Sequence, residues 1–534
     1  MKNKWKITIA AALLAATSAT AFSNIGVKAG DVDMIKFDSS ITATTPHNGN
    51  EISVVHSGME SVLKMTNMSP SELGKYYYYT PDMQEFNNKG LPSSQEEIRA
   101  CYDNNDDFAP INNTLAWNCE SDAESYTVNV ALDKNFTKVV FSETVAETSV
   151  NLGNTLYSGT EYYWQVIANG EEKVYSEIFE FSTKAGTRTI DLDGVSNTRD
   201  VGGYQTPNGK TMQGLIYRTA RLDDVTDEGR ATAEKLGFKT DLDLRAVGEG
   251  QANPLGINFV NATPAPLYAN GINTPEGKAA IKTVFQTFAN KDNYPIVMHC
   301  SVGRDRTGTA TALLNAVLGV DEQTIVNEYL LSVFAYISSW NKVSDALMVN
   351  IQGLMAYMNT FTGETLAEKA ENLLLDAGVT AEEIQATRDI MLGNTQVYDN
   401  TVECDVAYEN MHFVTVNAYG YARETWAVKD GVTFDMPFAI DEAYVWTVDG
   451  VAYDFSQPVT ADFTLQVEKQ ESIQVLVSVN GAEVVIKAQA GDSVDFSQFA
   501  KDGYTYKIMD AEGNIISSLT AVKDCAVSVV YFKN

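Results

Sequence analysis

Between residues 114 and 183, short apolar runs alternate with polar residues, and polar turns separate one run from the next. A spacing of two is typical of strands with one covered face, and several such strands close together predict a β-sandwich. Trp117 and Trp164 fall within these runs, so we expect both indoles in the core. The stretch from residue 30 onward is assigned to the same domain, over 30–185, as an N-terminal extension. The strands expected here cover residues 115–117, 126–130, 136–140 and 162–166.

The apolar spacing changes to three and four residues beyond a polar stretch at 184–189, which predicts a linker. A short buried strand is predicted at residues 294–298, followed by an Ala/Leu-rich helix over 309–318 that Gly319 ends as a C-cap. The region that follows the linker therefore mixes strands and helices. One apolar helix face is formed by Ile281, Val284, Phe285 and Phe288.

Strand patterns return near the C-terminal end, and two stretches echo each other at a distance of about 60 residues. The segment 431–435 parallels the segment 491–496. We therefore expect two small β-rich repeats, over residues 400–468 and 469–534. Neither repeat carries a cluster of residue types with catalytic chemistry, so spacing or adhesion to an unknown surface partner is the expected role.

The first 29 residues have the composition of a secretory signal peptide. Lys2, Lys4 and Lys6 precede an apolar run over residues 7–16, and small residues follow. The run is too short for a stable bilayer span, and no other stretch is long and apolar enough for one. We therefore expect a bacterial protein that is secreted, extracellular or associated with the cell surface, without a membrane span.

The 534-residue chain is strongly acidic, with 38 Lys and Arg residues against 70 Asp and Glu residues and a net charge of −32. Such a surface repels polyanions, which argues against nucleic-acid or anionic-membrane partners. A local basic pocket can still exist inside an acidic protein.

The chain has five cysteines, and an odd number in an exported protein suggests one reactive thiol. Cys300 is the natural candidate for this thiol. The other four could pair within the expected domains, Cys101 with Cys119 and Cys404 with Cys525. Equally, all five thiols could be free.

Residues 299–308, HCSVGRDRTG, lie where the predicted strand at 294–298 runs into the predicted helix. The loop must therefore wrap around the first turn of that helix. Free backbone N–H groups and the positive end of the helix dipole converge there and suit a phosphate. Cys300 lies within reach of that point.

The residue types in this loop fit phosphoryl transfer, which needs positioning, charge neutralisation and an in-line nucleophile. Cys300 would attack phosphorus as a thiolate and form a phosphocysteine. Arg306 would hold two phosphate oxygens with a fork of N–H groups that lysine lacks. Asp305 is the candidate acid for the leaving oxygen, and then the base for water. The candidate phosphate cradle consists of Ser301, Val302, Gly303, Arg304 and Arg306.

Two neighbours of this cradle have supporting roles. His299 can help to lower the pKa of the cysteine, and Thr307 could donate a hydrogen bond to its sulfur. No metal or other cofactor is expected for this chemistry.

HCSVGRDRTG resembles the signature of cysteine-dependent protein tyrosine phosphatases, and most closely that of the bacterial tyrosine/serine and lipid phosphatase branch. Residues 197–204, NTRDVGGY, resemble the N-terminal motif of that branch and contain the supporting candidates Arg199 and Asp200. The resemblance implies a central α/β phosphatase domain over residues 187–397, with a mostly parallel sheet, that acts on a phosphorylated protein, lipid or small molecule. Further matching segments, in the same order, are residues 217–219, 241–245 and 328–332.

The loop departs from this branch at Arg304, where the branch usually has lysine. A bidentate fork there replaces a point charge, which affects the preference among phosphate esters. No Trp-Pro-Asp loop of the animal enzymes is evident, so the resemblance implies that Asp305 is the acid. Asp200 is its rival, although we expect Asp200 to shape the pocket wall.

The flanking regions have weaker resemblances. Trp117, residues 126–128 and residues 156–166 resemble parts of fibronectin type III modules, and the C-terminal repeats resemble small β-rich repeats of secreted bacterial surface proteins.

Three functions are consistent with the sequence. The first is a secreted phosphatase that hydrolyses phosphomonoesters, phosphotyrosine above all, through a phosphocysteine. The second is a phosphoinositide or inositol-phosphate phosphatase with the same fold. The third is a non-catalytic surface protein for phosphate binding or adhesion, against which the intact Cys300, Asp305 and Arg306 argue.

Overall fold

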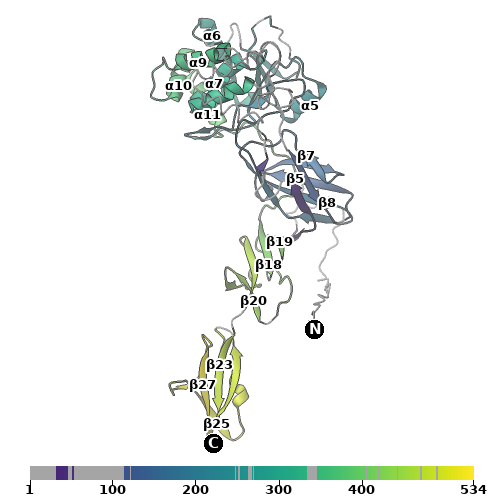
Figure 1. Ribbon diagram of the computed structural model, residues 1–534, viewed down its shortest axis with the longest axis vertical. Coiled ribbons are helices and arrows are strands. Elements are labelled where there is room, and N and C mark those ends of the chain that lie inside the picture. Colours follow the sequence, from purple (N-terminus) through teal and green to yellow (C-terminus); the bar gives the residue numbers. More distant parts are fainter. Residues whose placement is uncertain are drawn as a thin grey trace, which may run out of the picture. The chain divides into compact units, whose positions relative to one another are not determined.

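The protein is described by a computed structural model, shown in Figure 1. The described residues are 32–45, 51–52, 54, 113–120, 122–246, 248–249, 253–262, 268, 270–333, 345–404, 406–418, 421–441, 443–469, 472–488 and 491–534. The predicted signal peptide and Cys101 lie outside these residues. The chain divides into two compact units, one formed by Ser40–Cys404 and the other by Met1–Ser39 together with Asp405–Asn534.

The N-terminal part of the first unit consists of β-strands around one apolar core. Trp117 and Trp164 are both buried in this core, as expected. One sheet contains β2 (Thr42–Thr45), β4 (Thr114–Asn118) and β7 (Ser149–Asn151). The other strands are β3 (Glu51–Ile52), β5 (Ser125–Ala131), β6 (Val139–Val145), β8 (Glu161–Asn169), β9 (Lys173–Ser176) and β10 (Phe179–Thr183). The likeness to fibronectin type III modules remains a prediction.

The strand predicted at residues 136–140 begins later, at Val139. Phe136 has a φ of 55° and lies in a turn. The Asp133 carboxylate organises this turn by accepting hydrogen bonds from the backbone N–H groups of Thr137, at 3.1 Å, and Lys138, at 2.7 Å. A carboxylate that captures local N–H groups competes with strand pairing, so the ladder starts beyond it.

The prediction of a linker at residues 184–189 is wrong, because the second half of this stretch is buried. Arg188 is 2% exposed, and its guanidinium donates to Asp200 at 2.9 Å and lies over the ring of Tyr157. Nearby, the backbone N–H of Ser158 donates to the side-chain oxygen of Gln213, while the Gln213 amide donates back to the Ser158 carbonyl, both at 2.9 Å. The β-sandwich region is therefore joined to the following domain by buried polar contacts.

The central domain has a five-stranded sheet, and three of its four strand pairs are parallel, which confirms the expected mostly parallel sheet. Its order is β11 (Arg199–Asp200), β14 (Ile216–Thr219), β17 (Ile296–His299), β15 (Thr240–Asp243) and β16 (Asn258–Asn261). A small hairpin of β12 (Gln205–Thr206) and β13 (Gly209–Lys210) comes between β11 and β14 in the sequence.

Helices cover both faces of this sheet. One face packs against α5 (Asp227–Lys235), and Tyr217 and Val297 contribute to that core. The other face packs against the remaining helices through Ile216, Ile296 and Met298, and Figure 1 shows α6, α7 and α9 to α11 gathered there. These are α6 (Pro275–Ala289), α7 (Asp305–Leu318), α8 (Glu322–Leu330), α9 (Asp345–Met358), α10 (Leu366–Asp376) and α11 (Ala381–Met391).

Two helix predictions are confirmed. The four residues of the predicted apolar face on α6 are all buried in the core. Gly319 ends α7 with a φ of 90°, the left-handed conformation that a C-cap glycine adopts. Parallel strands place their carboxyl ends at one edge of the sheet, and the register aligns His299 with Thr219 and with Asp243 at this edge.

The C-terminal unit contains two small sheets with the same strand order and the same pairing pattern. The first contains β18 (Met411–Ala418), β19 (Tyr421–Lys429), β20 (Tyr444–Val448), β21 (Val451–Ala452) and β22 (Phe463–Lys469). The second contains β23 (Ile473–Val479), β24 (Ala482–Ala488), β25 (Tyr504–Met509), β26 (Ile515–Ile516) and β27 (Cys525–Lys533).

Strand β1 (Met34–Asp38) pairs with β19 of the first C-terminal sheet, although the range 30–185 assigned to the N-terminal domain includes it. Cys525 is a free thiol, which agrees with the alternative of unpaired cysteines and not with a bond to Cys404. Across the described residues, no helix combines the length and apolarity needed to cross a bilayer.

Candidate active site

The candidate phosphate loop connects β17 to α7, as the sequence predicts. The strand ends at His299, and the helix begins at Asp305. Gly303 has a φ of 66°, and a Cβ there would lie 2.3 Å from the carbonyl oxygen of Thr219. Only glycine therefore fits, and the loop can press closely against the end of β14.

Cys300 lies at the start of this loop and is 2% exposed. Burial alone would raise the pKa of its thiol, but the pKa is lowered overall. The positive charge of Arg306, the nearby Thr307 hydroxyl, and the backbone N–H groups of Thr307 and Val302 outweigh burial. The Thr307 hydroxyl is buried, and no described residue forms a hydrogen bond with it. The site therefore favours the nucleophilic thiolate.

Two of the three guanidinium nitrogens of Arg306 have hydrogen-bond acceptors. Its Nη1 donates to Glu249 Oε2 at 2.7 Å, and its Nη2 donates to Ser301 Oγ at 2.9 Å. Its Nε is buried, and no described residue accepts a hydrogen bond from it. The guanidinium carbon lies 5.7 Å from the ring centroid of Tyr268. A buried N–H without an acceptor is costly, and a bound oxyanion would satisfy it.

Glu249 is a site residue that the sequence analysis missed. Its carboxylate contacts Arg306 and also accepts from Ser301 Oγ at 3.4 Å. Its side chain is 41% exposed, so it borders solvent at the loop. One feature of the sequence could have indicated Glu249 as a site residue. It lies four residues after Arg245, and Arg245 ends the segment 241–245 that resembles the phosphatase branch.

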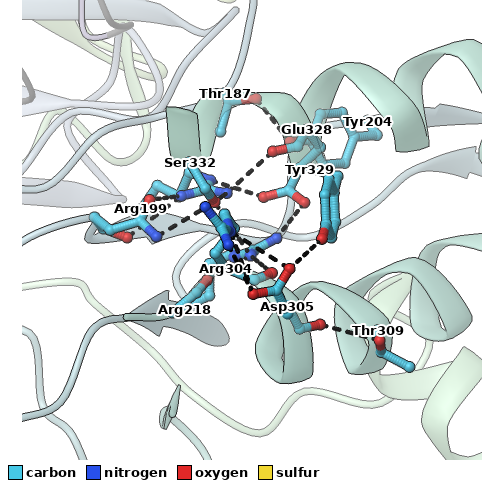
Figure 2. Close-up of polar contacts among 12 residues, drawn as sticks. Thr187, Arg199, Tyr204, Arg218, Arg304, Asp305, Thr309, Glu328, Tyr329 and Ser332 are labelled. Carbon is cyan, nitrogen blue, oxygen red and sulfur yellow. Dashed lines mark hydrogen bonds and ion pairs between the residues drawn. The ribbon is translucent and has the colours of Figure 1, made fainter. Parts of the chain in front are cut away.

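Asp305 begins α7 and is held by two side chains, as Figure 2 shows. The Tyr329 hydroxyl donates to its Oδ1 at 2.7 Å, and Arg304 pairs with its Oδ2 at 3.2 Å. The Asp305 side chain is 14% exposed. Arg304 is thus engaged with its own neighbour in the loop.

A buried cluster of three charges lies against the loop (Figure 2). Glu328 of α8 accepts from Arg199 Nε at 2.7 Å and from Arg218 Nη1 at 2.5 Å, and all three side chains are at most 2% exposed. Burial and the charge of Arg218 lower the pKa of Arg199 to about 10. Burial would raise the pKa of Glu328, but the two guanidinium groups lower it. Two cations against one anion leave the cluster positive beside an anion-binding loop.

The same cluster fixes the backbone of the loop. Arg218 Nη2 donates to the carbonyl of Gly303 at 2.6 Å and to that of Arg304 at 3.2 Å. Asn197 Nδ2 donates to the carbonyl of Val302 at 3.0 Å. Carbonyls that are held in this way leave the loop N–H groups available to a bound anion.

Replacing Glu328 with glutamine should lower the free energy of unfolding of the central domain by about 3–5 kcal/mol, because two buried guanidinium groups lose their counterion. Because the pKa of Glu328 is lower in the folded protein, the ionised carboxylate contributes its full stabilisation above the pKa of an unfolded glutamate, about 4.3. This stabilisation is lost as the pH falls through the pKa of the folded state. Denaturant unfolding at several pH values should therefore show a difference that narrows in acid. Glu322→Gln, at an exposed position on the same helix, is the control, and equal stability of both variants would contradict the expectation.

His299 is fully buried behind Cys300. Its Nε2 lies 2.8 Å from Asp241 Oδ1, and its Nδ1 lies 3.3 Å from the Cys300 carbonyl oxygen. Burial would lower the pKa of His299, but Asp241 and Asp243 raise it overall. The contact with Asp241 thus fixes the position of the imidazole at the start of the loop.

Asp200 lies elsewhere, although it follows Arg199 directly. Its carboxylate accepts from Arg188 and from the backbone N–H groups of Gly202, at 2.9 Å, and Gly214, at 2.7 Å. Of these partners, Arg188 contacts Tyr157 and Asn154 of the β-sandwich region. A role of Asp200 in the pocket wall remains a prediction.

The structure thus brings most candidates together. The loop holds Cys300, Ser301, Val302, Gly303, Arg304, Asp305, Arg306 and Thr307, with His299 at its start and Arg199 beside it. Besides Glu249, the residues missed are Asn197, Arg218, Tyr268 and Glu328, which come from distant segments.

Comparison with known proteins matches residues 190–393 to the tyrosine phosphatase family. A tyrosine-protein phosphatase of Nostoc commune is 30% identical over an alignment of 153 residues, and the match covers 24% of this chain and 52% of that protein. The chain thus spans about half the length of that relative. The triple specificity protein phosphatase PtpB of Mycobacterium tuberculosis is 24% identical over 277 residues, 38% of this chain and 99% of that protein.

Among solved structures, the core catalytic domain of the PP-IP phosphatase Siw14 from S. cerevisiae is 21% identical. The match covers 28% of this chain and 84% of that domain, with a TM-score of 0.20. The family match and the named relatives show that the central region is similar to tyrosine phosphatases.

Proposed function

We propose that the central domain hydrolyses phosphomonoesters, with phosphotyrosine as the preferred group, through a phosphocysteine intermediate. The observation that carries this proposal is a buried Cys300 with a lowered pKa beside Arg306, whose Nε has no acceptor among the described residues. The first supplies a nucleophile, and the second supplies a donor for a phosphate oxygen.

In the first step, the Cys300 thiolate attacks phosphorus, and the bond between phosphorus and the ester oxygen breaks. Asp305 gives its proton to the departing oxygen. In the second step, Asp305 takes a proton from water as the water oxygen attacks phosphorus. The P–S bond then breaks, and the buried Thr307 hydroxyl, which has no partner among the described residues, donates a hydrogen bond to the leaving thiolate.

The names of the relatives favour phosphotyrosine, and the triple specificity of PtpB favours a range of substrates rather than one. The alternative of a phosphoinositide or inositol phosphate relied on Arg304 as an extra cation. The ion pair of Arg304 with Asp305 reduces that argument, because the cation is already neutralised. A non-catalytic phosphate-binding protein would not require a thiol of lowered pKa.

Two measurements test the proposal. Turnover of para-nitrophenyl phosphate in the presence of EDTA separates a metal-independent phosphatase from a binding protein. Phosphate release from phosphopeptides, phosphoinositides and inositol phosphates then ranks the substrates. No turnover of any ester would refute the phosphatase, and a clear preference for inositol phosphates would refute phosphotyrosine.

The role of the acid gives a further prediction. Asp305→Asn should slow the hydrolysis of phosphotyrosine by about 10²-fold or more, and that of nitrophenyl phosphate much less, because nitrophenolate leaves without a proton. Turnover of both esters by this variant checks the role. Asp200→Asn and Glu249→Gln are the comparison variants. If one of these two alone shows the leaving-group dependence, Asp305 is not the acid.

We also propose that the chain is exported, on the basis of its first 29 residues. Detection of the protein in the culture medium or on the cell surface of the producing bacterium would support this. Retention of the full-length chain inside the cell would refute it.

A further inference from the structure

The two C-terminal sheets allow a direct comparison, because each strand of one has a counterpart in the other. β19 and β24 are counterparts. β19 forms a hairpin with β18, which pairs in parallel with β22. In the same way, β24 forms a hairpin with β23, which pairs in parallel with β27. Each is also the last strand on the same side of its own five strands.

The outer edge of β19 is covered by an added strand. β1 pairs with it antiparallel, with Met34 opposite Val428 and Lys36 opposite Trp426. Lys36 also forms an ion pair with Glu424 at 2.9 Å. This strand position can therefore accept an antiparallel neighbour, and opposite charges help to set the pairing.

The corresponding edge of β24 is open within the described part of the chain. Among the described residues, β23 is the strand that pairs with β24. Val484 is 39% exposed and Val485 is 50% exposed, whereas Ala427 and Val428 of β19 are fully buried. Exposed edge strands with apolar side chains tend to pair with another chain unless they are protected.

The sequence of β24, AEVVIKA, is complementary to itself when it is read in reverse. In an antiparallel pair of two copies centred on Val485, Glu483 of each copy lies opposite Lys487 of the other. Val484 lies opposite Ile486, and the alanines at the two ends face each other. Opposite charges and apolar pairs at such positions each contribute to sheet stability.

The two faces of the strand fit this register. Ile486 and Ala488 pack against the core of the second sheet, so Val484, which has the same parity, lies on that face. Pairing would place Val484 of one copy against Ile486 of the other and extend both cores. Glu483, Val485 and Lys487 share the opposite face, where the charge pairs would form.

We infer that β24 is a dimerisation edge, on which a second copy of this chain adds its own β24 in antiparallel orientation. The contact is isologous, as two-fold symmetry requires, and it joins the two five-stranded sheets into one. The phosphatase domains are thereby presented in pairs.

Charge reversal on the full-length chain tests this register. Sedimentation velocity over a range of concentrations should show a dimer for the wild type. Glu483→Lys or Lys487→Glu alone should give monomers, because like charges then face each other. The double variant, which exchanges both charges, should dimerise again. Glu512→Lys, an exposed change in the turn between β25 and β26, is the matched control and should remain dimeric.

A mixing experiment makes the test independent of any loss of stability. Equal amounts of the Glu483→Lys chain and the Lys487→Glu chain should form a mixed dimer, since each brings the charge that the other lacks. A monomeric wild type would overturn the inference. Single variants that stay dimeric, or a mixture that stays monomeric, would also overturn it. Phosphatase turnover of each variant reports that the central domain is intact.

Discussion

Cys300→Ser should lower turnover by roughly 10⁴-fold or more while leaving the binding of inorganic phosphate nearly unchanged. A serine hydroxyl stays protonated where the thiol ionises, so the nucleophile is lost. The groups that hold the anion remain, because Arg218 and Asn197 still fix the loop carbonyls and Arg306 still offers its N–H groups.

Steady-state kinetics with para-nitrophenyl phosphate measure the first effect, and calorimetric titration with phosphate measures the second. Substantial remaining turnover would exclude a phosphocysteine. Loss of phosphate binding together with turnover would mean that the thiolate helps to build the anion site, so that nucleophile and cradle cannot be separated.

Arg306→Lys should reduce turnover by about 10²–10³-fold, the usual cost of removing one donor to the charge that develops in a transition state. Lysine keeps the positive charge beside Cys300, but it cannot donate to Ser301 and Glu249 and still offer an N–H to phosphate in the same plane. Kinetics of the purified variant test this.

The pH dependence of Cys300 alkylation by iodoacetamide separates the two roles of Arg306. A thiol pKa that stays low in a slow Arg306→Lys variant assigns the defect to phosphate binding. A variant that keeps most of the wild-type rate would disprove bidentate recognition. Arg304→Lys serves as the companion change and should alter the ranking of substrates more than the rate on the best one.

The parts of this protein that could be predicted from sequence are those in which neighbours in the chain determine the structure. The phosphate loop is such a part, because a strand, a glycine and a helix N-terminus within ten residues define it. The apolar face of α6 is another, since its spacing alone shows which side is buried.

The sequence does not reveal contacts between distant segments. Arg218 and Glu328 are 110 residues apart, yet together they hold the loop. The stretch around Arg188 looked like a linker because it is polar, and its polar groups are buried only because Asp200 and neighbouring groups accept their hydrogen bonds. Strand β1 is too short for its pattern to identify its partner, and β19 lies almost 400 residues away.

Strand β11 has a consequence for where the central domain begins. Its two residues point to opposite sides, so Arg199 supports the phosphate loop while Asp200 reaches Arg188 beside Tyr157 and Asn154 of the sandwich region. A chain that began at residue 190, where the family match begins, would lack Arg188 and would leave a buried carboxylate without its counterion. An excised central domain should therefore begin before Arg188, so that Asp200 keeps its counterion.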